Sequence, residues 1–217
     1  MICPILFYSP LHSPSLTGLR PTQEDRLTIA TRFFREDVTF CGVFDGTVGD
    51  DAAEYISKNI VSHLCSALEL HLPDGRAPPR TGSEGTSGVS DEEAESLKEA
   101  LRSTFLNADR ALIEYCAARK LHYASCTGVT CFLWKNLLTA AHIGDSKACI
   151  AKIIGDEVHP EWLTVDHKPN NPAELKRIEA NGGSLAWLHG NKPYIRYVYT
   201  SCSGWAESWL RFRPIFF

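Results

Sequence analysis

The chain has 217 residues, of which 44% are hydrophobic and 22% charged, with a formal net charge of −4. These values are typical of a globular protein with a sizeable core, and they exclude wholesale disorder. Basic residues are scattered, so the composition does not favour nucleic-acid binding. No apolar run reaches the ~18 residues that a membrane span needs, and no basic leader begins the chain. We therefore expect a cytoplasmic or nuclear protein.

The eight cysteines form no Cys-x-x-Cys pair, and most lie among apolar neighbours. This pattern favours buried thiols over disulfides or a zinc site. None is followed six places later by an arginine, so a Cys-x5-Arg phosphate loop is absent from the sequence. If the chain handles phosphate, the sequence indicates that it uses a metal.

The first expected elements are two strands that form a hairpin. Extended segments over 27–34 and 38–44 flank the charged turn 35–37. The second segment leads directly into Asp45 and Gly46, so the hairpin presents a carboxylate at a strand end.

Two long helices are expected next. From Asp51 apolar residues recur every three or four positions, which predicts a helix capped by Asp50 or Asp51. A capping-box pattern at Ser90 and Glu93 precedes a second apolar stripe. Between them, residues 73–90 contain too few large apolar side chains to offset their ordering entropy, which predicts a mobile surface insertion.

The following part of the chain has short β-type segments. Runs over 127–134, 137–142 and 147–153 are separated by turn residues and predict an antiparallel meander. Asn171 and the proline after it predict the start of a short helix that ends at Gly182. Helices grouped between runs of strands favour an α+β fold with a mostly antiparallel sheet.

The strongest candidate site combines these signals near the first hairpin. Hydrolysis at two metals needs carboxylates that bridge hard cations and a backbone oxygen or water to complete the coordination. Asp45 fits the bridging role, and Gly46 lets a carbonyl approach an ion. Glu24 and Asp25 lie near it if their segment pairs beside the second strand. Arg20 would then hold phosphate oxygens.

Each signal also has an ordinary structural explanation. Asp45-Gly46 is also the pattern of a turn, Glu24-Asp25 that of a solvated charge pair, and 144–146 that of a hairpin turn. Taken singly, short motifs of this kind are more often structural than catalytic. Their order along the chain is the more informative observation.

Five ordered segments resemble the motifs of the metal-dependent serine/threonine phosphatases of type 2C, the PPM family. The segments are 18–25 with Arg20, Glu24 and Asp25, 43–49 with Phe-Asp-Gly, 125–130, 141–148 with Gly-Asp-Ser, and 163–183 with Asp-His-Lys-Pro and the final glycine pair. The resemblance covers the chain from about Gly18 to Gly183.

The resemblance implies a four-layer αββα sandwich with a Mg²⁺ or Mn²⁺ pair between its sheets. It implies that a bridging hydroxide attacks phosphoserine or phosphothreonine in protein substrates, with no covalent enzyme intermediate. We also expect the protein to be a monomer. Asp145 corresponds to a ligand of a weaker third metal found in some members.

The same resemblance assigns roles near the first hairpin. Asp45 would bridge the two metals, and Glu24 with the Gly46 carbonyl would complete one site. Asp25 would orient metal-bound water, and Arg20 would hold the phosphate. Arg20, Asp25 and Asp45 are therefore the predicted catalytic residues, and Glu24, Asp45, Gly46 and Asp145 the predicted metal ligands.

Two departures from the family pattern bear on activity. Thr47 stands where the family has a histidine, and a hydroxyl is a poor acid near neutral pH, which predicts a slower or water-assisted protonation of the leaving group. No aspartate follows Asp166, so the later Ser-Asp-Gly and Asp-Asn motifs are absent. The alternative hypothesis is therefore a catalytically weak or inactive phosphatase-like binding module.

The resemblance also divides the chain. We predict an N-terminal extension over 1–17, a partial phosphatase domain over 18–198, and a divergent tail over 199–217 that is rich in aromatic residues. The phosphatase fold would then be incomplete at its C-terminal end. Missing strands leave sheet edges unpaired, which predicts marginal stability.

Overall fold

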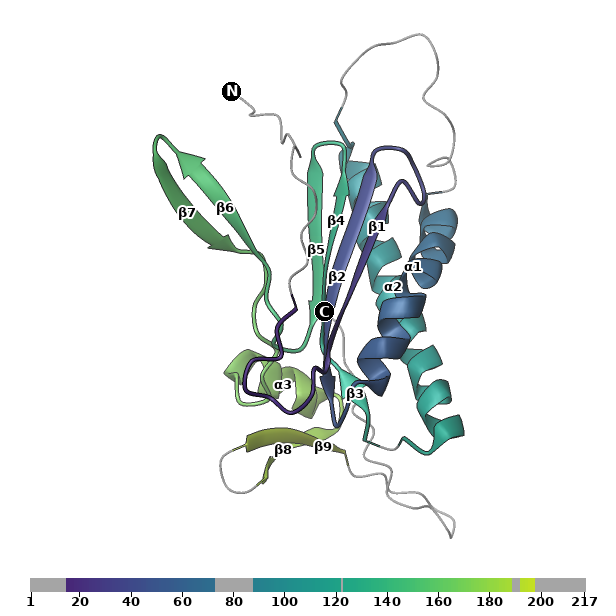
Figure 1. Cartoon of the computed structure of the whole chain (residues 1–217), viewed down its shortest axis with the longest axis vertical. Helices are drawn as coiled ribbons and strands as arrows, with labels where there is room; N and C mark the ends of the chain where they lie inside the picture. Colours follow the sequence, from purple (N-terminus) through teal and green to yellow (C-terminus); the bar gives the residue numbers. More distant parts are fainter. Residues whose placement is uncertain (1–14, 73–87, 122, 189–191, 198–217) are drawn as a thin grey trace.

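The structure of the chain is a computed structural model that describes residues 15–72, 88–121, 123–188 and 192–197 (Figure 1). Its elements are β1 (Asp25–Thr31), β2 (Val38–Thr47), α1 (Asp51–His71), α2 (Asp91–Arg119), β3 (Ser125–Cys126), β4 (Gly128–Trp134), β5 (Leu137–Ile143), β6 (Cys149–Ile154), β7 (Glu157–Trp162), α3 (Pro172–Ala180), β8 (Gly183–Leu188) and β9 (Lys192–Tyr197). Most of the predicted insertion and all of the predicted tail lie outside the described residues.

A five-stranded antiparallel sheet forms the centre of the described structure. Its strand order is β1-β2-β4-β5, and the short β3 pairs with the end of β2. The helices α1 and α2 lie side by side on one face of this sheet (Figure 1). The predicted α+β class with antiparallel strands is confirmed, and the helical layer on a sheet matches one side of the expected sandwich.

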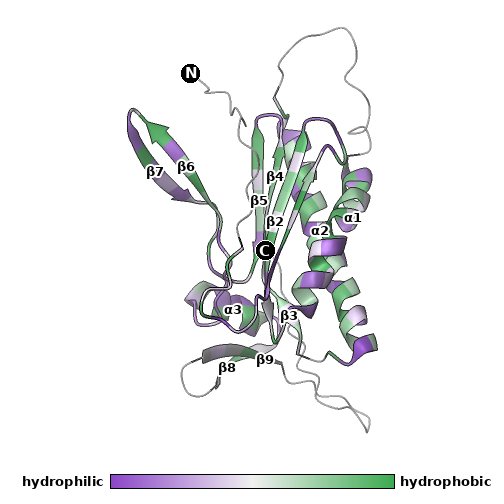
Figure 2. Ribbon diagram, in the orientation of Figure 1, coloured by the Kyte–Doolittle hydropathy of each residue, from purple (hydrophilic) through white to green (hydrophobic). Residues whose placement is uncertain are grey.

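The alternation of side chains along β2 explains why one face of the sheet carries the helices. Val38, Phe40 and Phe44 are buried toward α1 and α2, and Phe40 has no exposed surface. The intervening Val43 is 47% exposed on the opposite face. Figure 2 shows hydrophobic residues along the central strands and mixed hydropathy along the two amphipathic helices. The core therefore lies between the sheet and the helix pair.

The predicted start of α1 is confirmed, but its predicted capping bond is wrong. Asp50 occupies the N-cap position with φ −98° and ψ −5°, and its side chain makes no capping hydrogen bond. Its carboxylate forms an ion pair with Arg26 instead. A helix cap needs an extended N-cap backbone, so the conformation of Asp50 directs its side chain to another partner.

The predicted capping box of α2 is confirmed. The Ser90 hydroxyl accepts a hydrogen bond from the Glu93 backbone N–H at 3.2 Å, and the Glu93 carboxylate accepts one from the Ser90 N–H at 2.8 Å. Both bonds use backbone donors that the first turn of a helix leaves unpaired. The hydrogen bond from Ser90 also lowers the pKa of the Glu93 carboxyl.

Replacing Ser90 with alanine should lower the free energy of unfolding by about 1 kcal/mol, because the Glu93 N–H loses its acceptor. Urea denaturation followed by circular dichroism measures the loss. Ser66→Ala is the matched control, since the Ser66 hydroxyl is exposed and contacts only the Ser62 carbonyl of its own helix. Equal midpoints for the two variants would contradict a stabilising role of the capping box.

The structure corrects several strand boundaries. The predicted strand over 27–34 is β1, which begins earlier at Asp25 and ends earlier at Thr31. The strand predicted over 38–44 extends to Thr47, because the last residues of β2 pair with β3. Asp45 therefore lies inside β2, at the position where its pairing changes from β1 and β4 to β3.

The predicted three-stranded meander is correct only for β4 and β5. The third strand, β6, leaves the sheet and pairs with the unpredicted β7 in a separate hairpin, whose residues are largely exposed (Figure 1). The predicted short helix is confirmed as α3, where Asn171 accepts a hydrogen bond from the Ala173 N–H and Pro172 begins the first turn. A further hairpin, β8–β9, follows it.

Among the residues that the structure describes, no helix is both long and apolar enough to cross a bilayer.

Candidate metal and phosphate site

Two of the predicted carboxylates lie directly opposite each other on neighbouring strands. The β1–β2 register pairs Asp25 with Asp45 and, one step further, Arg26 with Phe44. Successive side chains of a strand point to opposite faces. Because Phe44 is buried toward the helices, Asp25 and Asp45 face the open side of the sheet, and both are exposed.

The predicted site residues around this pair share one polar pocket. The pocket has a volume of about 240 Å³. Its lining residues are Leu16, Thr17, Arg20, Thr22, Gln23, Glu24, Asp25 and Asp45. The structure therefore brings together Arg20, Glu24, Asp25 and Asp45, as the sequence predicted. Three carboxylates and one guanidinium form the charged groups of this pocket.

The electrostatic environment of Asp45 is strongly negative. Partial burial raises the pKa of the Asp45 carboxyl, and the negative charges of Asp25 and Asp145 raise this pKa further. A hydrogen bond with Asp25 acts in the same direction, whereas the positive charge of Arg20 lowers the pKa. Carboxylates that disfavour one another's ionisation form a favourable site for a cation.

The backbone at Gly46 allows the segment that carries Glu24 to approach the end of β2 that carries Asp45. Its N–H donates a hydrogen bond to the Glu24 carbonyl oxygen at 3.2 Å. A Cβ atom at this position would lie 2.6 Å from the Gly49 carbonyl oxygen and 2.9 Å from that of Glu24. Only glycine fits here, so the segments that carry Glu24 and Asp45 are held together by backbone contact.

The loop after Gly46 has an unusual backbone. Val48 has φ 60° and Gly49 has φ 99°. A β-branched residue in the left-handed region is strained, and such strain costs about 1–3 kcal/mol at the sites where it occurs. The strained turn connects the end of β2 to α1, so it fixes where the helix begins relative to Asp45.

Asp145, the remaining predicted ligand, lies close enough to Asp45 to raise its pKa but does not line the pocket. Its Oδ2 atom lies 3.7 Å from the Lys168 ammonium. The adjacent Ser146 hydroxyl forms a 2.5 Å hydrogen bond with the Thr127 hydroxyl, and Thr127 in turn contacts the backbone of Asp45. Thr127 therefore couples the Asp145 loop to β2.

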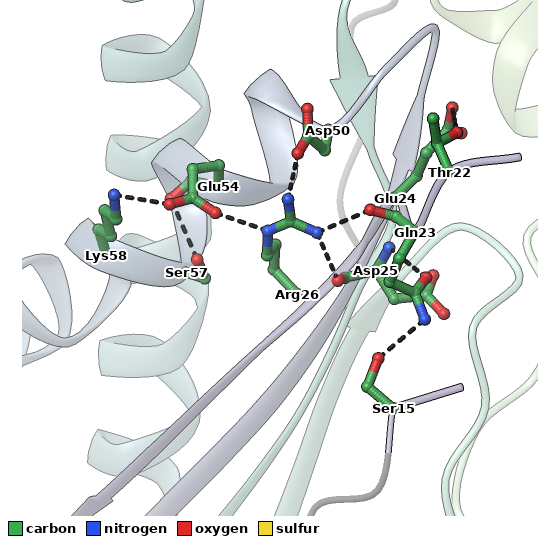
Figure 3. A network of polar contacts seen from close by, with 10 residues as sticks. All are labelled: Ser15, Thr22, Gln23, Glu24, Asp25, Arg26, Asp50, Glu54, Ser57 and Lys58. Carbon is green, nitrogen blue, oxygen red and sulfur yellow. Dashed lines mark hydrogen bonds and ion pairs between the residues drawn. The ribbon is translucent and has the colours of Figure 1, made fainter. Parts of the chain in front are cut away.

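Arg26 is a residue that the sequence did not identify, and it links the segment that carries Glu24 and Asp25 to α1 (Figure 3). One terminal nitrogen donates to the carbonyl oxygens of Gln23 and Asp25, both at 2.9 Å. Its Nε donates to the Glu54 carboxylate at 2.5 Å, and the other terminal nitrogen pairs with Asp50. Arg26 therefore ties the segment that carries Glu24 and Asp25 to the first turn of α1.

Arg26→Lys should lower the free energy of unfolding by about 1–3 kcal/mol, because an ammonium cannot reproduce the planar fork that serves four acceptors. It should also weaken Mn²⁺ binding, since Glu24 and Asp25 lose a positional restraint. Urea denaturation and a Mn²⁺ titration measure the two effects. Arg110→Lys is the control on an exposed part of α2. Unchanged Mn²⁺ affinity in a destabilised Arg26 variant would show that Arg26 stabilises the fold without positioning the site.

The described side chains do not form a closed metal cage. Among the residues that the structure describes, no group of three or more His, Cys, Asp or Glu side chains is arranged to hold an ion. The pocket nevertheless supplies carboxylate oxygens beside a backbone that approaches closely, which are the donors that Mg²⁺ and Mn²⁺ prefer. Its chemistry fits a hard divalent cation and an anion held by Arg20.

The order of these residues along the chain corresponds to a known family. A family model described as protein phosphatase 2C matches residues 10–192. The chain belongs to the protein phosphatase 2C family. It is 34% identical over 170 residues to the probable protein phosphatase 2C 55 of Oryza sativa subsp. japonica, and this match covers 78% of the chain and 38% of the rice protein.

Other protein phosphatase 2C relatives give a consistent picture. The chain is 29% identical over 181 residues to protein phosphatase 2C 1 of Paramecium tetraurelia, across 79% of the chain and 51% of that protein. Its structure resembles the crystal structure of serine-threonine phosphatase 2C from Toxoplasma gondii with a TM-score of 0.68 and 38% identity. That match covers 82% of this chain and 56% of the Toxoplasma chain. The chain thus spans about half the length of these relatives or less.

Proposed function

We propose that this protein phosphatase 2C chain hydrolyses phosphoserine and phosphothreonine in protein substrates and needs Mg²⁺ or Mn²⁺ to do so. The observation that supports this proposal is that Arg20 lines the same polar pocket as Glu24, Asp25 and Asp45. A guanidinium binds a phosphate dianion, and clustered carboxylates bind the cations that offset its charge. Family membership supports the same chemistry.

The residues that would hold the cations follow from the site. Glu24 and Asp45 offer carboxylate oxygens, and the constrained backbone at Gly46 offers a carbonyl beside them. Asp145 is a further candidate, because its charge already acts on Asp45. When bound, a divalent cation supplies Lewis acidity and lowers the pKa of the attacking water. The raised pKa of Asp45 fits this role, since a cation would favour the ionised carboxyl.

The protein's own side chains would orient the phosphate ester and manage protons. Arg20 is exposed at the rim of the pocket, where its guanidinium could hold two phosphate oxygens. Asp25 faces Asp45 across the strand pair and could accept a proton from water. The substrate phosphoproteins, a monomeric state and a cytoplasmic or nuclear location are parts of the same proposal.

Hydrolysis of a phosphothreonine peptide by the purified chain tests the proposal. We expect phosphate release with Mn²⁺ present and none after EDTA is added. The Asp156→Asn variant is a suitable control, because Asp156 is exposed in the turn between β6 and β7. Release that persists in EDTA, or the absence of release from folded protein, would contradict the proposed activity.

A second candidate function is a phosphatase-like module that binds phosphoproteins without turnover. The observation that favours it is that the described carboxylates do not converge as a closed set of ligands. Binding of the phosphothreonine peptide without phosphate release, weakened by Arg20→Ala, would support this module.

Thr47→His should raise the turnover of an active chain near neutral pH. Thr47 is exposed at the end of β2, so an imidazole fits there without displacing core residues. General-acid catalysis typically contributes about 10²–10⁴-fold, and a threonine hydroxyl supplies little of it. Steady-state kinetics as a function of pH would show a faster reaction whose rate falls again at alkaline pH, where the imidazole loses its proton. A variant whose rate and pH profile match the wild type would contradict an acid role at this position.

A further inference from the structure

Two cysteines lie opposite each other on the central strands of the sheet. The β2–β4 register pairs Cys41 with Cys131. Directly opposed residues of an antiparallel ladder have Cα atoms about 4.5–5.5 Å apart. A disulfide needs a Cα separation of about 4.4–6.8 Å, so the backbone of this pair already meets the requirement. The Cys41 Sγ atom lies 3.8 Å from the Cys131 carbonyl oxygen.

Both thiols belong to the open face of the sheet. Phe40 and Gly42, the neighbours of Cys41, are buried toward the helices, so Cys41 itself points to the other side. Its partner on β1 is Ile29, which is 38% exposed. Cys41 and Cys131 are each partly exposed, which leaves room for a small solute to reach the sulfur atoms.

We propose that Cys41 and Cys131 are a redox-active pair that closes to a reversible disulfide when the protein meets a hydroperoxide. The Cys41 thiolate attacks one peroxide oxygen and the O–O bond breaks, giving a sulfenic acid at Cys41 and hydroxide that takes a proton from solvent. Cys131 then loses its proton and its thiolate attacks the Cys41 sulfur, so that an S–S bond forms, the S–O bond breaks and the sulfenic hydroxyl leaves with that proton as water. Two thiols are oxidised, and one hydroperoxide is reduced.

The ionisation of the two thiols supports these different roles. A hydrogen bond from the Cys131 side chain lowers the pKa of the Cys41 thiol to about 7, against the opposing effect of burial. The same contact raises the pKa of Cys131. A thiol whose pKa lies near ambient pH is the best attacking group. Cys41 is therefore the residue that reacts first with the oxidant, and Cys131 is the residue that resolves the sulfenic acid.

A second pair of neighbouring cysteines lacks this property. Burial raises the pKa of Cys126 to about 12, and the nearby Cys116 contributes to that rise. Burial also raises the pKa of Cys116. Thiols that stay protonated react slowly with peroxide. Proximity alone therefore does not make a pair of cysteines reactive in this protein. Cys41 and Cys131 differ from Cys116 and Cys126 because they lie directly opposite each other in the strand register and because the pKa of Cys41 is lowered.

The disulfide would join two adjacent central strands four residues from Asp45 on β2. It would cross-link β2 to β4 at the middle of the sheet, where the register is already set. The thiol pair lies outside the lining of the polar pocket. Its oxidation can therefore be measured whether or not the chain hydrolyses phosphate esters.

Peptide mapping under non-reducing conditions tests the proposal on the full chain. After treatment with hydrogen peroxide, we expect a cross-linked peptide that contains Cys41 and Cys131, lighter by two hydrogen atoms and released by dithiothreitol. Cys131→Ser should stop at a Cys41 sulfenic acid that dimedone traps, whereas Cys41→Ser should give neither product. Cys149→Ser, which removes an exposed thiol on β6, should leave the cross-link unchanged.

Two results would overturn the proposal. One is oxidation of Cys149 while Cys41 and Cys131 stay reduced at the same peroxide concentration. The other is a disulfide between different partners, such as Cys116 and Cys126. Circular dichroism of each serine variant establishes that it is folded. If a variant is unfolded, the non-reducing peptide map of the wild-type chain decides the question on its own.

Discussion

Asp45→Asn should lower the affinity for Mn²⁺ by more than about 100-fold and abolish metal-dependent phosphate release. Residues that only support a metal ligand cost about 10–100-fold in affinity when replaced, so a direct ligand should cost more. The amide keeps the size of the carboxylate but removes its negative charge, which lies close to the negative charges of Asp25 and Asp145. Removing this charge also relieves repulsion, so the variant should fold at least as stably as the wild type in the absence of metal.

Two measurements separate loss of binding from loss of folding. The electron paramagnetic resonance signal of free Mn²⁺ reports binding without requiring turnover, and urea denaturation reports stability. Asp37→Asn provides a matched control, because Asp37 lies in the turn before β2, far along the strand from the pocket, and pairs with Arg35. Wild-type Mn²⁺ affinity in Asp45→Asn would remove Asp45 from the metal site and with it the proposed mechanism.

The parts of the fold that local sequence determines could be predicted well. The capping box of Ser90 and Glu93 acts within one turn, and Asn171 caps α3 through its immediate neighbour. In these cases the side chain and its backbone partner lie within three residues of each other. The predicted hairpin of β1 and β2 was also correct, because a short turn joins two strands that are adjacent in the sequence, although its strand ends were not.

Elements that depend on distant partners could not be predicted in the same way. The strand β3 has two residues, and it exists because Ser125 and Cys126 meet the end of β2. The hairpin of β6 and β7 is largely exposed, so it lacks the alternation of buried and exposed positions that identifies a half-buried strand. The strand predicted over 147–153 corresponds to β6, whereas its partner β7 was not predicted.

The candidate site shows the same division. Asp25 and Asp45 could be placed together because a hairpin aligns them. Arg26 could not be identified, since its acidic partners Asp50 and Glu54 lie 24 and 28 residues further along the chain. Its position directly after Glu24-Asp25 was the one available signal, but a charged residue there could equally face solvent. Folding of α1 against β1 decides between these possibilities.

Phe40→Ala should destabilise the chain by about 3–5 kcal/mol, as truncation of a buried aromatic residue usually does. Phe40 is fully buried near the start of β2, and its ring packs edge-on against Phe33 with centroids 6.4 Å apart. Domains of this size are typically stable by only about 5–15 kcal/mol, so the variant should lose a large part of its stability. Its urea midpoint should fall by roughly 2 M for an m-value near 2 kcal/mol per molar.

The size of the loss also tests the predicted marginal stability of the whole chain. Leu27, Ile29 and Val43 expose apolar surface on the open face of the sheet, so the interface between β2 and the helices supplies most of the burial in this part of the fold. If total stability is low, Phe40→Ala should be unfolded without urea at 25 °C. Leu70→Ala is the control: this side chain is 73% exposed, so its truncation should change the free energy of unfolding by less than about 0.5 kcal/mol. A cooperatively folded Phe40→Ala chain with a high urea midpoint would contradict marginal stability, and would indicate that packing of this sheet on its two helices is not the main source of stability.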